Sequence, residues 1–161
     1  MSWVVSVGAP PPSCSGPRSD ARYSCGIADE TCVVVTVGRL AEVKTHARLL
    51  RAVAGRRAIK ILIAGDGECR RDLEKKIAEL SCQDQVQLLG EQSQADIGRL
   101  FAAADAFILP SLWESFGMAP LEAAASGLPI AVADIPAMRE LAGEPDAGQA
   151  LFFDPKSVPE I

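Results

Sequence analysis

Short apolar runs alternate along most of the chain with segments whose apolar residues recur at helical spacing. The first run, 32–37, is rich in β-branched residues, which is typical of a strand buried on both faces of a parallel sheet. The segment 46–54 follows, with Leu49, Leu50 and Val53 on one helical face. The pattern therefore predicts a strand followed by an amphipathic helix.

The same alternation continues toward the end of the chain. The expected strands are 59–63, 86–89, 106–109, 129–132 and 150–153, and the expected helices are 68–80, 96–104, 121–126 and 137–141. Strands that alternate with helices of about ten residues indicate a parallel sheet with right-handed crossovers. We therefore expect an α/β fold, a Rossmann-like parallel sheet with helices on both faces.

The beginning of the chain shows neither the helical nor the strand periodicity of apolar residues. Residues 9–30 contain three consecutive prolines and scattered Ser and Gly, a composition typical of irregular chain. We therefore expect residues 1–30 to be an irregular lead-in and residues 31–161 to form one domain.

Composition narrows the class of protein. A chain of 161 residues with 48% hydrophobic and 23% charged residues is an ordinary globular domain. A net charge of −5 argues against a dedicated nucleic-acid binder, and no apolar run approaches the roughly 18 residues of a membrane span. Five cysteines without a close Cys-x-x-Cys pair fit neither a disulfide framework nor a zinc site. We expect a cytoplasmic protein without a bound metal.

Two glutamates frame the most informative segment. Glu114 and Glu122 stand on either side of Gly117, between the expected strand 106–109 and the expected helix 121–126. In an open parallel sheet, ligands bind at such strand-to-helix turns, where helix N-termini attract anions. Glycine at position 117 permits a positive φ or a close backbone approach.

Glu122 also has a structural interpretation. With Ala119 as N-cap and Pro120 at the first helical position, Glu122 falls at N3, where a Glu can cap the helix. The residues alone leave both roles open.

A basic pair follows the first expected strand. Gly38 precedes Arg39, and Lys44 lies five residues further on in the same expected loop. Arg supplies a rigid fork of donors and Lys a mobile charge, and both suit a diphosphate, although both could equally be solvated surface cations. His46, the single histidine, lies at the start of a predicted helix, and we interpret it as structural.

The segment 114–122 resembles the donor-binding motif of the retaining GT-B glycosyltransferases of family four, also called glycosyl transferases group one. In that motif, seven residues separate two glutamates that embrace a nucleotide sugar. Gly38-Arg39-Leu40 followed by Lys44 also looks like the family's basic pair, and 63–67 looks like its second strand and turn. The resemblance runs from about Thr31 to Asp154 and covers only the C-terminal, donor-binding domain.

The resemblance implies a role for each of these residues. Glu122 would accept hydrogen bonds from the ribose hydroxyls, and Glu114 would face the donor sugar on the reacting side of the cleft. Arg39 and Lys44 would bind the diphosphate and stabilise the leaving group in place of a metal ion. Six further residues would approach the donor with their main chains: Gly38, Gly90, Ser115, Phe116, Gly117 and Met118.

The function implied by the resemblance is transfer of a sugar, of the hexosyltransferase type, with retention. The donor would be a nucleoside-diphosphate sugar, no cofactor would be needed, and the acceptor would be a glycan, a lipid or a small molecule in polysaccharide or glycoconjugate biosynthesis. The partner would be an N-terminal acceptor domain or separate subunit, without which we expect the chain to be inactive. The chain also stops before the family's C-terminal helices, so a truncated product or a non-catalytic nucleotide-sugar-binding module is the alternative. A flavodoxin-like regulator is a third reading, and peripheral attachment at the inner membrane face stays open.

Overall fold

A six-stranded sheet forms the centre of the protein. The computed structural model describes residues 18–24, 27, 31–143, 148 and 150–156. All strand pairs in the sheet are parallel, and the strand order is β3-β2-β1-β4-β5-β6. The strands are β1 (Cys32–Val37), β2 (Ile59–Ala64), β3 (Val86–Gly90), β4 (Ala106–Leu109), β5 (Ile130–Ala133) and β6 (Leu151–Phe153).

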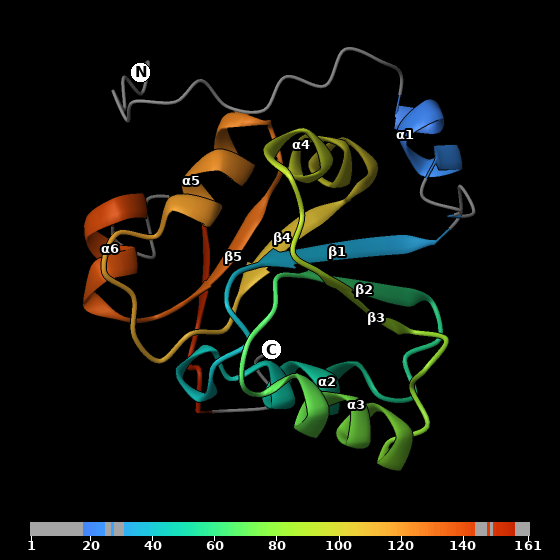
Figure 1. The fold of residues 1–161 in the computed structure, drawn as a ribbon. Coiled ribbons are helices and arrows are strands. Elements are labelled where there is room, and N and C mark those ends of the chain that lie inside the picture. The colour runs from blue at the N-terminus through green and yellow to red at the C-terminus, as the bar shows by residue number, and fades with distance from the viewer. Residues whose placement is uncertain (1–17, 25–26, 28–30, 144–147, 149, 157–161) are drawn as a thin grey trace.

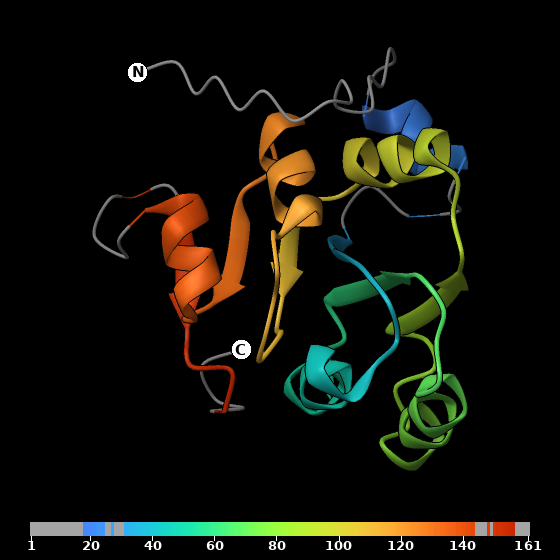
Figure 2. The same ribbon diagram turned by 60° about the vertical axis from the view of Figure 1, so that its left-hand side comes forward.

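Helices cover both faces of this sheet. They are α1 (Arg18–Ser24), α2 (His46–Val53), α3 (Arg70–Glu79), α4 (Gln94–Ala103), α5 (Met118–Ala125) and α6 (Pro136–Ala142), with a short 3-10 helix η1 (Glu42–Lys44) before α2. Helices α4 and α5 lie on one side of the sheet, and α2 and α3 lie on the other (Figure 1). Figures 1 and 2 both show α5 beside α6. The predicted Rossmann-like α/β fold is confirmed.

The position of β1 fixes where a ligand can bind. Val33 and Val35 are fully buried, and β1 pairs with β2 along its whole length and with β4 on its other side. The strand order reverses at this point, because the chain builds outward from β1 to β3 and then returns to β4. In doubly wound sheets the carboxyl ends of the strands at such a switch point form the binding crevice.

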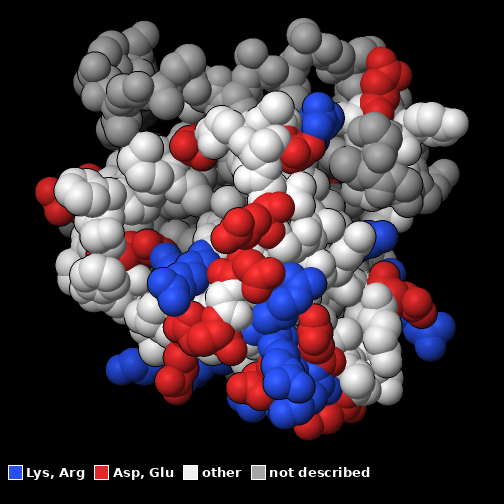
Figure 3. All heavy atoms as spheres, in the orientation of Figure 1, with Lys and Arg blue, Asp and Glu red and all other residues white. Residues whose placement is uncertain are grey.

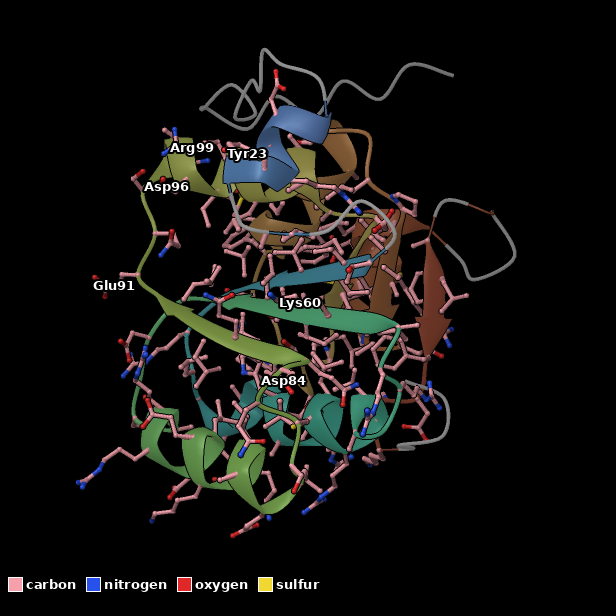
Figure 4. The ribbon with its side chains drawn as sticks, turned by 90° about the vertical axis from the view of Figure 1, so that its right-hand side faces the viewer. Tyr23, Lys60, Asp84, Glu91, Asp96 and Arg99 are labelled. Carbon is pink, nitrogen blue, oxygen red and sulfur yellow. The ribbon has the colours of Figure 1, made fainter. Side chains whose placement is uncertain are left out.

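A helix lies where the sequence pattern indicated irregular chain. Arg22 of α1 is only 2% exposed, and its guanidinium bonds the carbonyl oxygens of Ala103 (3.1 Å) and Thr31 (3.0 Å) and a carboxylate oxygen of Asp105 (2.5 Å). The same carboxylate oxygen accepts the N–H of Val33 at 2.8 Å. Helix α1 is therefore anchored by a buried cation rather than by an apolar stripe, which is why helical periodicity missed it. Figure 4 shows α1, marked by Tyr23, beside α4, marked by Asp96 and Arg99.

Replacing Arg22 by Met should destabilise the fold by about 3 kcal/mol, because it leaves the partly buried Asp105 carboxylate without its guanidinium. Urea unfolding measures the change. Arg99→Met is the matched control, since Arg99 pairs with Asp96 on the surface and should contribute far less. Equal stabilities for the two variants would contradict a structural role of the Arg22 pair.

His46 is buried at the start of α2. Its Nδ1 atom has no hydrogen-bond partner, and burial, followed by the nearby charge of Lys44, lowers the pKa of His46 from 6.5 to about 4. The folded protein therefore holds this side chain neutral under conditions in which the unfolded chain begins to protonate it. Stability linked to His46 is complete above pH 6.5 and is lost as the pH falls from 6.5 toward 4.

Wild type should lose about 2 kcal/mol of unfolding free energy between pH 7 and pH 5 through this group. In His46→Leu most of that loss should disappear, because His46 is the only histidine and few other side chains titrate in this interval. Urea unfolding of both proteins at the two pH values supplies the comparison. Parallel pH dependences would show that His46 protonates as freely in the folded protein as in the unfolded chain.

Candidate functional site

The carboxyl ends of three neighbouring strands meet through their backbones. The N–H of Gly38, after β1, donates to Ala64 of β2 at 2.9 Å, and the N–H of Gly65 donates to Gly90 of β3 at 2.7 Å. A Cβ atom on Gly65 would stand 2.0 Å from the carbonyl oxygen of Gly38. Only glycine fits at position 65, and its φ of +132° also disfavours other residues.

A cavity of about 680 Å³ opens above this glycine contact. It is lined by the loops after β1, β2 and β3 and by helices α4 and α5: Val37, Gly38, Arg39, Ala64, Gly65, Asp66, Gly67, Glu91, Gln92, Gln94, Ile97 and Glu122. Arg39 and Glu122 therefore reach the same cavity from opposite halves of the sheet. Glu91 leaves the end of β3, below α4 (Figure 4).

Arg39 is the basic residue of the cavity wall, and it already has a partner. Its Nε donates to Glu68 at 3.1 Å, while the Arg39 side chain remains 73% exposed. Hydrogen bonds from its own backbone and from Arg39 hold the pKa of Glu68 below its usual value, so Glu68 is ionised at neutral pH. On the face of the molecule that Figure 3 shows, acidic and basic side chains lie side by side across the lower half.

Lys44 and Glu114 form a second, more enclosed pair. Lys44 Nζ lies 2.5 Å from Glu114 Oε1, and the two side chains are 18% and 10% exposed. The same carboxylate oxygen accepts a hydrogen bond from the buried Ser111 at 2.8 Å. Lys44 Cε lies 4.0 Å from where a Cβ on Gly38 would stand, so the pair adjoins the cavity without lining it.

The two predicted phosphate cations are thus held differently. Both follow β1, but Lys44 is the last residue of η1, and of the two only Arg39 lines the cavity. Lys44 is joined to the β4–α5 segment through Glu114. The structure brings together Arg39 with Glu122, and Lys44 with Glu114.

The start of α5 differs from our expectation. Gly117 is the N-cap, in the left-handed conformation with φ +64°, and the helix begins at Met118. Neither Ala119 as N-cap nor Glu122 at N3 is correct, because glycine closes the turn two residues earlier than the expected cap. Pro120 is tolerated because the N–H groups of the first turn have no partner within the helix. Glu122 falls in the second turn, beyond the reach of a capping box.

The middle of the glutamate motif, residues 115–118, contributes no residue to the cavity lining. Phe116 is 79% exposed, and Ser115 and Met118 are also exposed. A Cβ on Gly117 would stand 2.5 Å from the terminal carbon of Met138 in α6, so Gly117 permits close packing as well as the turn. Gly90, with φ +73°, ends β3 next to the lining residue Glu91.

Sequence reasoning missed several lining residues. Gln94 and Ile97 were not singled out, and Asp66 was noted only as part of the turn in 63–67, although it follows β2 at the same two-residue spacing that Arg39 has after β1. Ser111 was assigned no role, although its spacing of three residues from Glu114 was an available signal.

Neither a metal-binding cluster nor a membrane-spanning helix occurs among the described residues. No group of His, Cys, Asp or Glu side chains in this part of the chain is arranged to hold a metal ion. No helix among the same residues is long and apolar enough to cross a membrane.

Comparison with known proteins extends these observations. A family model for glycosyl transferases group 1 matches residues 18–161, so the match includes α1 and begins before Thr31. The D-inositol 3-phosphate glycosyltransferase of Mycobacterium marinum is 37% identical over 125 residues, 74% of this chain and 27% of that protein. An uncharacterised glycosyltransferase of Methanocaldococcus jannaschii is 33% identical over 123 residues, 74% of this chain and 32% of that protein. The chain spans about a quarter to a third of the length of these relatives.

Two solved structures of known proteins share the fold of this chain. HepE from Anabaena, in complex with UDP and glucose, matches with a TM-score of 0.80 at 27% identity, over 89% of this chain and 39% of that chain. Sucrose-phosphate synthase from Thermosynechococcus elongatus shares the fold, with a TM-score of 0.80 at 24% identity, over 89% of this chain and 37% of that chain. Since the family model covers nearly all of the sequence, the chain belongs to the family glycosyl transferases group 1.

Proposed function

We propose that this chain is the donor-binding half of a retaining GT-B glycosyltransferase of family four. It binds a nucleoside-diphosphate sugar and presents the sugar for transfer to an acceptor glycan, lipid or small molecule. The observation that carries the proposal is the cavity at the carboxyl ends of β1, β2 and β3, which has Arg39 on one wall and Glu122 on another. Its volume lies within the range of about 300–1,000 Å³ that is usual for small-molecule sites.

Each charged residue has a part in this proposal. Transfer breaks the bond between the sugar and the diphosphate, so negative charge develops on the leaving phosphate oxygen. Arg39 and Lys44 stabilise that charge, and Glu122 accepts hydrogen bonds from the two ribose hydroxyls. Glu114 contacts the donor sugar, next to Lys44, with which it is paired in the free protein.

The main chain completes the proposed donor site. The peptide groups of Ser115, Phe116 and Met118 lie at the start of α5, where unpaired N–H groups favour anions. Gly38, Gly90 and Gly117 let the main chain approach the donor without an intervening side chain. UDP is the nucleotide that we propose to test first, because HepE, which shares the fold, is complexed with it.

The acceptor site belongs, in this proposal, to a second domain or subunit that faces the donor half across a cleft. Aligning reactants and catalytic groups can account for roughly 7–11 kcal/mol of a barrier, and one wall of a cleft does not supply that alone. The lone chain therefore holds the donor without transferring its sugar. Robust sugar transfer by the 161-residue chain would refute this, and transfer absent even after fusion to an acceptor domain would favour a binding module.

Arg39→Ala and Lys44→Ala should each weaken UDP binding about tenfold, because a charge-assisted hydrogen bond contributes about 1.5–3 kcal/mol before solvent screening. Glu68→Gln should strengthen it about two- to fivefold, because Arg39 no longer has to leave an exposed ion pair. Isothermal calorimetry measures all three. Lys75→Ala, on the exposed surface of α3, is the control. Unchanged affinity in both cation variants would reject the phosphate assignment.

Glu122→Ala should remove the preference for UDP over 2′-deoxy-UDP, which we expect to be about tenfold in wild type, because only the ribonucleotide offers the second hydroxyl to the carboxylate. Glu91→Ala serves as a matched control, since Glu91 lines the same cavity from the opposite side. Calorimetry with both nucleotides gives the ratio. A Glu122 variant that lowers the melting temperature yet keeps the preference would assign this residue a structural role.

A further inference from the structure

Two loops that leave neighbouring strands are fastened together at the switch point of the sheet. The loops are 38–45 after β1 and 110–117 after β4, and we call their connection the loop clasp. The N–H of Leu112 donates to the carbonyl oxygen of Val43 at 2.8 Å, and the hydroxyl of Thr45 donates to the carbonyl oxygen of Pro110. Lys44 lies between Val43 and Thr45 in the first loop, and its partner Glu114 follows Leu112 by two residues in the second loop.

Thr45 has an unusual backbone for its residue type. Its φ of 52° and ψ of 27° are left-handed, a conformation that residues other than glycine rarely adopt. Its N–H closes η1 on Glu42 at 3.0 Å, and its carbonyl oxygen accepts the N–H of Arg48 in α2 at 2.8 Å. Thr45 is therefore the one residue that links η1 to α2, and it is buried.

The hydroxyl of Thr45 serves the other loop rather than its own helix. Threonine at an N-cap usually accepts a backbone N–H of the first turn, but Thr45 makes no such bond. Its hydroxyl instead reaches Pro110, at the end of β4. Glycine would adopt this backbone without strain, so the backbone conformation does not call for threonine. What threonine adds is its hydroxyl, which makes the contact between the two loops.

We propose that Thr45 is a positioning residue that holds Lys44 against Glu114 across the switch point. This inference rests on the proposed function, and it adds the device that keeps the diphosphate cation and the sugar-contacting carboxylate together before the donor arrives. The hydroxyl of Thr45 holds the chain directly after Lys44 against Pro110. The N–H of Leu112, two residues before Glu114, holds the second loop against Val43. Lys44 is thereby placed by the β4 loop rather than by the β1 loop alone.

Thr45→Gly and Thr45→Ser separate the hydroxyl from the backbone conformation. Glycine accepts φ near +52° but removes the hydroxyl, so the free energy of unfolding should change little. Serine keeps the hydroxyl. In Thr45→Gly, acylation of the Lys44 amine in the nucleotide-free chain, measured by mass spectrometry, should become about fivefold faster, as expected for an ion pair that has loosened. Thr45→Ser should react like wild type.

The Glu114→Gln variant tests whether Thr45 acts on Lys44 through the ion pair. In Glu114→Gln the ion pair is already lost, so Thr45→Gly should add little to the Lys44 acylation rate, a non-additivity that independent sites do not show. UDP-glucose affinity should fall about fivefold in Thr45→Gly and stay near the wild-type value in Thr45→Ser.

Some results would overturn the proposal. Unchanged Lys44 reactivity in Thr45→Gly would do so, as would equal acceleration in the glycine and serine variants, because the hydroxyl would then not be the cause. Failure of wild type to bind either UDP or UDP-glucose would reject the proposed function instead. The acylation rates would still decide the role of Thr45, since they are measured without nucleotide.

Discussion

The close approach of the backbones after β1 and β2 is the constraint on which the candidate site depends. Gly38 and Leu40 both donate their N–H groups to the β2 side, at 2.9 Å to Ala64 and at 3.0 Å to Asp66. Leu40 is completely buried, whereas Arg39, between these two anchored residues, is exposed. The loop therefore has little freedom to place the guanidinium elsewhere, and a side chain at Gly65 would separate the two loops.

This constraint also explains how an acidic chain offers cations to a ligand. The net charge is −5, and Arg39 and Lys44 are each paired with a carboxylate of the chain. An exposed pair such as Arg39–Glu68 contributes little to stability, so Arg39 can exchange its partner at small cost. The Lys44–Glu114 pair is more enclosed and more costly to separate, because its members would have to regain hydration or new partners. Of the two cations, Arg39 therefore leaves its carboxylate partner at lower cost than Lys44 does.

The sequence predicted the sheet better than it predicted the site. Strands β1 and β4 have the predicted bounds because their apolar runs are buried on both faces, the situation in which hydrophobicity alone identifies a strand. Helix α1 was missed because Arg22, a residue type that is usually exposed, provides its buried contact.

Turns determine the features of the site that the sequence did not predict. The predicted N3 position of Glu122 in helix α5 was wrong, because the helix begins two residues earlier, after Gly117. Glycine permits many conformations, so its identity alone does not predict the left-handed N-cap. The different partners of Arg39 and Lys44 could not be predicted either, because they depend on η1, which ends at Lys44, and on Thr45, which joins this segment to Pro110 after β4. In each case a turn, rather than a hydrophobic pattern, decides which side chains meet.

The arrangement of charge within the cavity supports a division of the proposed donor site. Asp66, Glu91 and Glu122 line the cavity together with Arg39, so carboxylates outnumber cations among the lining residues. A diphosphate placed beside Glu122 would be repelled, whereas ribose hydroxyls would find an acceptor there. Because Glu122 lies beyond the first turn of α5, neither capping nor the helix dipole requires a carboxylate there. We therefore infer that the phosphates lie toward Arg39 and the neighbouring Lys44, and that the ribose lies toward Glu122.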